Sequence, residues 1–162
     1  MSRRARLASD AVFAAVAVCL FLAMLLGTGD DIGVTVDEPI YTGIALNLRD
    51  WFSLLVAEPK VALSRPVLDT AWWTRDMHPP LAKLLSALSM ALFDGVAPPL
   101  SAPRGGAMIL FTLLFVALYI SGRVTLGPLC GWLCALSSIA MPRLFGHAHL
   151  AATDLPAAAT AF

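Results

Sequence analysis

The most regular feature of the hydrophobic pattern is a run of 19 residues without a formal charge, from Ala11 to Gly29. At a rise of about 1.5 Å per residue, this run forms a helix about 28 Å long, close to the bilayer hydrocarbon thickness of about 30 Å. Two similar runs occur later and are separated by Arg123 and a Gly127-Pro128 break. The pattern predicts membrane spans at about residues 11–29, 105–121 and 129–145, and the start of a fourth from 156.

The charges on either side of the first run predict its direction. Arginines precede it at positions 3, 4 and 6, and aspartates follow it at 30 and 31. Because basic flanks stay in the cytoplasm, the N-terminus is predicted to be cytoplasmic and the segment after residue 29 external. A cleaved signal peptide is the alternative. Against it, the apolar run is longer than a typical signal core, and residues 25–29 lack a small-x-small cleavage pattern.

The segment 30–104 is predicted to form one long external loop. It holds 15 of the 22 formally charged residues and three of the four tryptophans, which suits the membrane interface. Within it, apolar positions three or four apart predict a short helix over 39–51. The prolines and mixed charges of 57–74 predict an irregular segment.

A second helix of this loop is predicted from about residue 80, because proline is tolerated only in a first helical turn and Pro79-Pro80 stands there. Only ten uncharged residues separate Lys83 from Asp94, about 15 Å of helix, which is half a bilayer. The stretch 81–93 is therefore predicted to be an interfacial helix and not a span.

The interfacial assignment of 81–93 determines the predicted topology. The next two spans form a hairpin whose tight turn carries Arg123, and a basic turn is expected in the cytoplasm. The segment after the hairpin, with Asp154, then returns to the same external face as Asp37 and Lys83. If 81–93 crossed the membrane instead, Asp154 would lie on the opposite side and the basic turn outside.

Composition narrows the class of protein. With 59% hydrophobic and 14% charged residues, the chain is too apolar for a soluble domain of its length. We expect an all-α, polytopic membrane protein whose long external loop carries interfacial helices, and the uncharged run near the C-terminus predicts the N-terminal part of something longer. A formal net charge of zero indicates no nucleic-acid partner. The three cysteines lie in apolar runs and predict neither a disulfide scaffold nor a metal site.

Motifs of charged and polar residues recur at the predicted external ends of the helices. They are Asp37-Glu38-x-x-Tyr41, His78-Pro79-Pro80-Leu81-Ala82-Lys83, Arg104 and Thr153-Asp154-Leu155-Pro156. In this order, over essentially the whole chain, they resemble the C-type membrane glycosyltransferases, in particular the branch of protein O-mannosyltransferases and lipid A aminoarabinose transferases. The resemblance implies transfer of a sugar from a polyprenyl-phosphate donor to a hydroxyl of a lipid, glycan or protein, on the external face of the inner cell membrane.

The resemblance implies a role for each matched residue, and each role has a plainer alternative. Asp37 would be the general base that takes the proton of the acceptor hydroxyl, or it would only cap the following helix. Lys83 would bind the donor phosphate and stabilise its growing charge, or it would extend to the lipid headgroups. His78 would add a hydrogen bond to that phosphate, and Glu38 and Tyr41 would support the substrate site.

Other residues are ambiguous in the same way. Arg104 would serve the same phosphate or simply mark the membrane boundary. Asp154 would be a second acidic group of the site or the N-cap of the next helix. His147 and His149 would share one side of an extended segment and could bind a metal with Asp154, whereas the resemblance implies catalysis without a metal or other cofactor.

Two other functions fit parts of the pattern. A transporter or channel also places charges at membrane edges, but it predicts charges within the spans, and the uncharged runs have none apart from Arg143 near one end. A non-catalytic assembly subunit predicts no convergence of acidic and basic groups at one face. The predicted convergence of Asp37, Lys83, Arg104 and Asp154 favours the glycosyltransferase.

Overall fold

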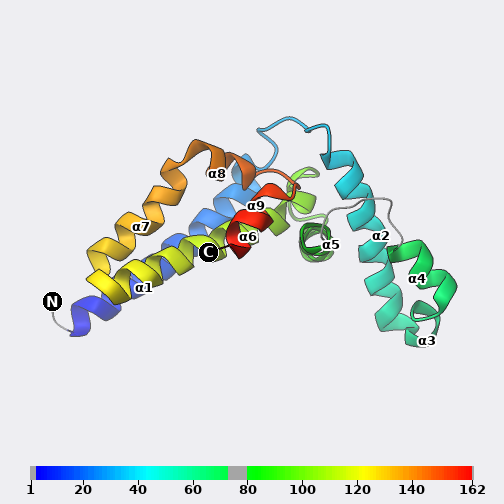
Figure 1. Cartoon of the computed structure of the whole chain (residues 1–162), viewed down its shortest axis with the longest axis horizontal. Coiled ribbons are helices and arrows are strands. Elements are labelled where there is room, and N and C mark those ends of the chain that lie inside the picture. Colours follow the sequence, from blue (N-terminus) through cyan, green and yellow to red (C-terminus); the bar gives the residue numbers. More distant parts are fainter. Residues whose placement is uncertain (1–2, 73–79, 162) are drawn as a thin grey trace.

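The protein is described by a computed structural model that covers residues 3–72 and 80–161. In these ranges the chain forms helices joined by turns, without any strand, so the all-α prediction is confirmed for them. Figure 1 shows the helices arranged as an arch. One leg is a bundle of α1 (Arg3–Ala23), α6 (Ser101–Leu126) and α7 (Pro128–Ala140). The other leg consists of α2 (Glu38–Ala57), α3 (Pro59–Ala62) and α4 (Arg65–Trp72).

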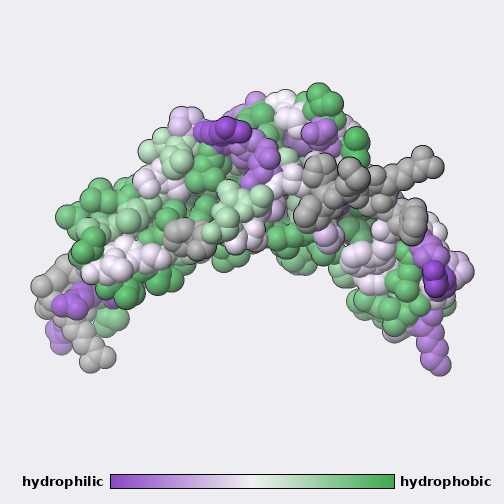
Figure 2. Space-filling model, viewed as in Figure 1, coloured by the Kyte–Doolittle hydropathy of each residue, from purple (hydrophilic) through white to green (hydrophobic). Residues whose placement is uncertain are grey.

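Two helices of the bundle are long and apolar enough to cross a membrane. The first is α1 together with the π-helical turn η1 (Met24–Thr28) that continues it, and the second is α6. Large apolar side chains on both, such as Val12 and Leu113, are exposed. Hydrophobic surface covers much of this leg in Figure 2. Exposed apolar surface of this kind is typical of a face that meets lipid or a partner, which supports association with a membrane.

The span predicted over 129–145 is not one continuous helix. α7 has 13 residues, about 20 Å of helix, and ends at Ala140; the next residue, Met141, has an extended backbone. A separate helix, α8 (Pro142–His147), follows. Proline explains the break, because it drives the preceding residue out of the helical conformation and cannot donate a helical hydrogen bond. The segment predicted as a span over 129–145 is therefore interrupted at Met141, and among the described residues only two helices have the length of a span.

The segment between the two long helices is more helical than predicted. The helix predicted over 39–51 is α2, which continues to Ala57, and α5 (Leu81–Phe93) has the predicted bounds. The stretch 57–74 was predicted to be irregular, but its described part forms α3 and α4. Each of these short helices has a proline in its first turn. Proline at that position favours the start of a helix instead of breaking one.

α6 is the central element of the fold. It packs against α1 and η1, against α5 and α7, and against α9 (Asp154–Thr160). Glycines allow the closest of these approaches. A side chain at Gly106 would lie 2.5 Å from the backbone of Leu85 in α5, and a side chain at Gly131 would lie 2.8 Å from the Tyr119 carbonyl oxygen. Small residues at such crossings let two helix backbones pack closely.

The two ends of the bundle carry different polar groups. At one end, Arg123 of α6 binds Asp10 of α1 with Nε–Oδ1 and Nη2–Oδ2 distances of 2.5 and 2.6 Å. The first part of α1 and the turn between α6 and α7 therefore lie at the same end of the bundle (Figure 1). Hydrogen bonds of Glu38 bring the starts of α2 and α6 and the turn before α9 together at the opposite end. Which side of a membrane each end faces stays a prediction.

Candidate functional site

A buried ion pair lies at the end of the bundle where α2 and α6 begin. Arg104, in the first turn of α6, binds Glu38, the first residue of α2, through two parallel bonds. The distances from Nε to Oε1 and from Nη2 to Oε2 are both 2.8 Å. The two residues are only 1% and 4% exposed, respectively. A bidentate pair of this kind fixes the relative orientation of the two side chains as well as their separation.

The other donor groups of Arg104 are also used inside the protein. Nη1 donates to the carbonyl oxygens of Gly29 and Ile32 at 2.6 and 2.7 Å, and Nη2 donates to that of Gly33 at 3.2 Å. All five N–H groups of the guanidinium therefore have acceptors. The backbone that follows η1 therefore surrounds this side chain. Its carbonyl oxygens replace the water that the guanidinium loses on burial.

Glu38 collects hydrogen bonds from two distant segments. Its carboxylate accepts the backbone N–H of Thr35 at 3.0 Å and that of Ala151 at 2.9 Å. Burial raises the pKa of the Glu38 carboxyl, but the hydrogen bonds from Arg104, Thr35 and Ala151 outweigh burial and hold the pKa below its ordinary value. Glu38 is therefore a charged structural centre that joins α2, α6 and the turn before α9.

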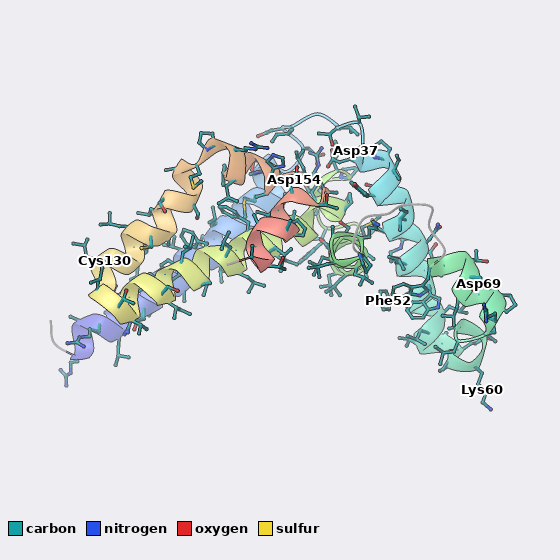
Figure 3. All side chains as sticks on the ribbon, viewed as in Figure 1. Asp37, Phe52, Lys60, Asp69, Cys130 and Asp154 are labelled. Atoms are coloured by element: carbon teal, nitrogen blue, oxygen red, sulfur yellow. The ribbon has the colours of Figure 1, made fainter. Side chains whose placement is uncertain are left out.

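Asp37 lies directly beside this centre, but its side chain is exposed. It occupies the N-cap position of α2, and its backbone carbonyl accepts the N–H groups of Ile40 and Tyr41 at 3.1 and 3.2 Å. Its side chain makes no capping hydrogen bond. Figure 3 shows Asp37 at the top of the arch, where α2 begins. The capping role considered from the sequence is thus not seen, and the carboxylate is accessible to a ligand.

Tyr41 and Lys83 connect α2 with α5. The Nζ atom of Lys83 lies 5.8 Å from the centre of the Tyr41 ring, within the range of a cation–π interaction. Both residues are buried, with 3% of Lys83 exposed. Lys83 therefore does not extend into the surroundings as a lysine at lipid headgroups would. Tyr41 lies one turn after Asp37, so the buried cation is near the part of α2 that carries the exposed carboxylate.

Asp154 reaches the same end of the molecule from a distant part of the sequence. It is exposed in the first turn of α9, and the N-cap of that helix is Thr153, so Asp154 is not the cap. Its Oδ2 atom lies 3.2 Å from His147 Nδ1, without hydrogen-bond geometry, and the contact is an ion pair only when the imidazole is protonated. Because Ala151 binds Glu38, the turn before α9 holds Asp154 at the end that carries Asp37.

The two histidines of this region do not share a partner. In the neutral ring, His149 Nδ1 donates to the Phe145 carbonyl at 3.0 Å, and Nε2 accepts from the Thr28 hydroxyl at 2.9 Å. His149 thereby ties the end of α8 to η1. No group of three metal-binding side chains is found in residues 3–72 and 80–161. The geometry therefore gives no support to a metal held by His147, His149 and Asp154.

A cavity of about 450 Å³ lies between the start of α5 and α9. It is lined by Leu81, Ala82, Thr153, Asp154, Pro156, Ala157 and Thr160. Its volume is in the range of small-molecule sites, and its wall combines one carboxylate and two hydroxyls with apolar groups. Ala82 directly precedes Lys83, so the cavity lies beside the segment that carries the buried cation.

The structure thus brings most of the predicted residues to one end of the molecule but gives them different environments. Asp37 and Asp154 are exposed carboxylates, whereas the charges of Glu38 and Arg104 neutralise each other. His78 lies outside the described residues. The backbone partners of the ion pair, above all the N–H of Ala151, were not predicted. A backbone group has no side-chain signature, and residue spacing cannot show which carbonyl faces a buried arginine.

Comparisons with known proteins find no match, since no family model, curated protein or solved structure is significantly similar to this chain. The resemblance to C-type membrane glycosyltransferases therefore rests on the sequence motifs alone. Support for a function has to come from the geometry of the residues themselves.

Proposed function

We propose that this protein is a membrane glycosyltransferase that transfers a sugar from a polyprenyl phosphate to an acceptor hydroxyl. The observation that carries the proposal is Asp37, an exposed carboxylate without a capping hydrogen bond whose neighbour Glu38 is held by four hydrogen bonds. An exposed carboxylate that makes no capping hydrogen bond but stands on a rigid support is suited to act on a bound group.

In the proposed reaction, the acceptor hydroxyl approaches the anomeric carbon of the donor sugar from the side opposite the phosphate. Asp37 takes the hydroxyl proton while the new carbon–oxygen bond forms, and the bond between the anomeric carbon and the phosphate oxygen breaks. The electron pair of that bond leaves with the polyprenyl phosphate. The configuration at the anomeric carbon is therefore inverted. Proton removal makes the acceptor oxygen a stronger nucleophile, which is the contribution of a general base.

Lys83 supplies the positive charge that the leaving phosphate needs. Charge grows on the phosphate oxygens as the bond breaks, and a cation in a water-poor place stabilises that charge more than a cation in bulk water. The burial of Lys83 and its position next to the cavity wall at Ala82 support this role. Asp154, in the opposite wall, would accept hydrogen bonds from the hydroxyls of the sugar.

Glu38 and Arg104 take a different role from the one that their motifs suggested. Arg104 has no N–H group left for a phosphate, and both oxygens of Glu38 already accept hydrogen bonds. We therefore assign them as positioning residues that hold Asp37 and the turn before Asp154. Tyr41 positions Lys83 through its ring. The role of His78 at the phosphate stays a prediction.

The proposal includes the membrane setting expected from the sequence. The protein would be a multi-pass protein of the inner cell membrane with a cytoplasmic N-terminus. The site would face outward, where lipids, glycans and proteins offer acceptor hydroxyls. The two long apolar helices and their exposed apolar side chains support insertion into a membrane. The proposed step uses no metal or other cofactor.

The test uses membrane vesicles that contain the protein, with polyprenyl phosphates that carry radioactively labelled mannose or aminoarabinose. We expect label to move into the lipid, glycan or protein fraction, and Asp37→Asn to slow the transfer by about a hundredfold to ten-thousandfold. Asp31→Asn removes another exposed carboxylate of the same segment and should transfer at the normal rate. No transfer from either donor, or an unchanged rate in Asp37→Asn at equal protein level, would overturn the proposal.

A further inference from the structure

A second place on the molecule has the features of a ligand site, and it lies on the leg formed by α2, α3 and α4. A hollow of about 490 Å³ is lined by Trp51, Leu63, Leu68, Asp69 and Trp72. A second hollow of about 420 Å³ also has Trp51 in its wall, together with Asn47, Asp50 and Thr70. Trp51 follows Asp37 by 14 residues, which is about 21 Å along α2, so this place is separate from the proposed reaction site.

Two indole rings form a rigid corner in the first hollow. The ring centres of Trp51 and Trp72 are 5.2 Å apart and their planes are inclined at 85°. Trp51 is anchored, because its Nε1 donates to the Ala62 carbonyl at 3.0 Å and the side chain is buried. Trp72 is 39% exposed. One ring therefore fixes the corner and the other offers surface to a ligand, so little side-chain freedom would be lost on binding.

The carboxylates in the walls of the hollows are balanced by arginines. Asp69 Oδ2 lies 3.4 Å from Arg65 Nε, and Asp50 Oδ1 accepts from Arg49 Nη2 at 3.0 Å. A carboxylate has about four acceptor positions, so each of these retains positions that can accept from hydroxyl groups. A charged ligand would gain little from such neutralised pairs, whereas a neutral ligand with several hydroxyls would find suitable acceptors.

We propose that this corner binds a neutral pyranose sugar. The C–H face of a pyranose packs on an indole ring, and the hydroxyls at its edge donate to carboxylate and amide oxygens. In the first hollow, Trp72 offers the first kind of surface and Asp69 offers the second. An acyl chain would instead desolvate the carboxylates without replacing their hydrogen bonds, which is unfavourable.

The sugar site does not depend on the proposed transfer reaction, because it shares no residue with it. The test measures binding of methyl α-mannopyranoside, methyl β-glucopyranoside and N-acetylglucosamine to the whole protein in lipid nanodiscs by saturation-transfer NMR. Cyclohexylmethanol serves as a ring-shaped ligand with a single hydroxyl. We expect saturation of the ring C–H protons of at least one sugar, and weaker saturation of cyclohexylmethanol.

Variants test whether the sugar binds at this corner and not elsewhere on the protein. Trp72→Ala should weaken sugar binding about tenfold, as expected for one lost stacking contact, and Asp69→Asn should weaken it as well. Trp132→Phe changes a tryptophan of α7 in the other leg and should bind the sugar normally. Asp37→Asn should also bind the sugar normally, even if it abolishes transfer. The inference would be overturned by three outcomes: no sugar binds, cyclohexylmethanol binds equally well, or both Trp72→Ala and Asp69→Asn bind as the wild type does.

Discussion

Glu38 and Arg104 are 66 positions apart in the sequence, yet their side chains are joined by two hydrogen bonds of 2.8 Å. Through Gly29, Gly33 and Ala151, the same pair also binds the segment after η1 and the turn before α9. The geometry around Asp37 and Asp154 therefore depends on one buried ion pair. Four segments of the chain that share no local sequence pattern meet there.

Arg104→Met should destabilise the protein strongly. It leaves the buried Glu38 carboxylate without its cation, and the loss of one partner of a buried pair typically costs about 3–5 kcal/mol. Thermal unfolding in detergent or nanodiscs measures the effect. Arg49→Met removes an arginine whose pairs with Asp50 and Asp94 are partly exposed, and should change stability by about 1 kcal/mol or less. If Arg104→Met unfolded like Arg49→Met, the pair would not be the structural centre of this end of the molecule.

The same pair predicts how stability depends on pH. The pKa of Glu38 lies below its ordinary value of 4.5, so its charge contributes fully above that value. The contribution is lost as the pH falls through the lowered pKa of the folded state. Relative to Glu38→Gln, the wild type should be more stable at neutral pH and should lose this advantage in acid. Unfolding of both proteins between pH 7 and about pH 3 checks the prediction, which a constant difference would contradict.

Asp37→Ala should leave folding almost unchanged. An N-cap residue that makes its hydrogen bond typically contributes about 1 kcal/mol, but the Asp37 side chain makes none. We expect a change in unfolding free energy of less than about 0.5 kcal/mol, together with the loss of transfer proposed for Asp37→Asn. Circular dichroism and thermal unfolding of the purified variant provide the measurement. A clear loss of helix or stability would mean that Asp37 is structural.

Cysteine labelling tests whether α5 crosses the membrane. In a variant without the native cysteines, Lys60→Cys and Val96→Cys should both react with a membrane-impermeant maleimide added outside intact cells, and Thr125→Cys should be protected. All three positions are exposed on the protein, so a failure to react reports the membrane side. Lys60 and Val96 lie before and after α5. Opposite labelling of these two positions would make α5 a span and reverse the topology that follows it.

Much of the helical framework was predictable from local sequence. Pro79-Pro80 and the charge at Asp94 defined the bounds of α5, and Gly127-Pro128 predicted the turn between α6 and α7, where Gly127 has a φ of 99°. Such signals act within a few residues, because proline and glycine change the backbone itself. By the same reasoning Pro142 could have predicted the end of α7 at Ala140, just before Met141. The proline was present there, but the prediction followed the length of the uncharged run instead.

The environments of the charged residues were decided only by the tertiary structure. Asp37 and Glu38 are adjacent and chemically almost identical. Nothing in the local sequence explains why Asp37 is exposed whereas Glu38 is only 4% exposed. Arg104 and the Ala151 N–H make that difference, because a carboxylate can lose water only where donors from elsewhere replace it. The sequence by itself determined most of the helical segments, although not α3 and α4, and that carboxylates follow the first helix. Long-range contacts decided which of these carboxylates stabilises the fold and which remains open to a ligand. Residue spacing does not encode the desolvation and hydrogen bonding of such contacts.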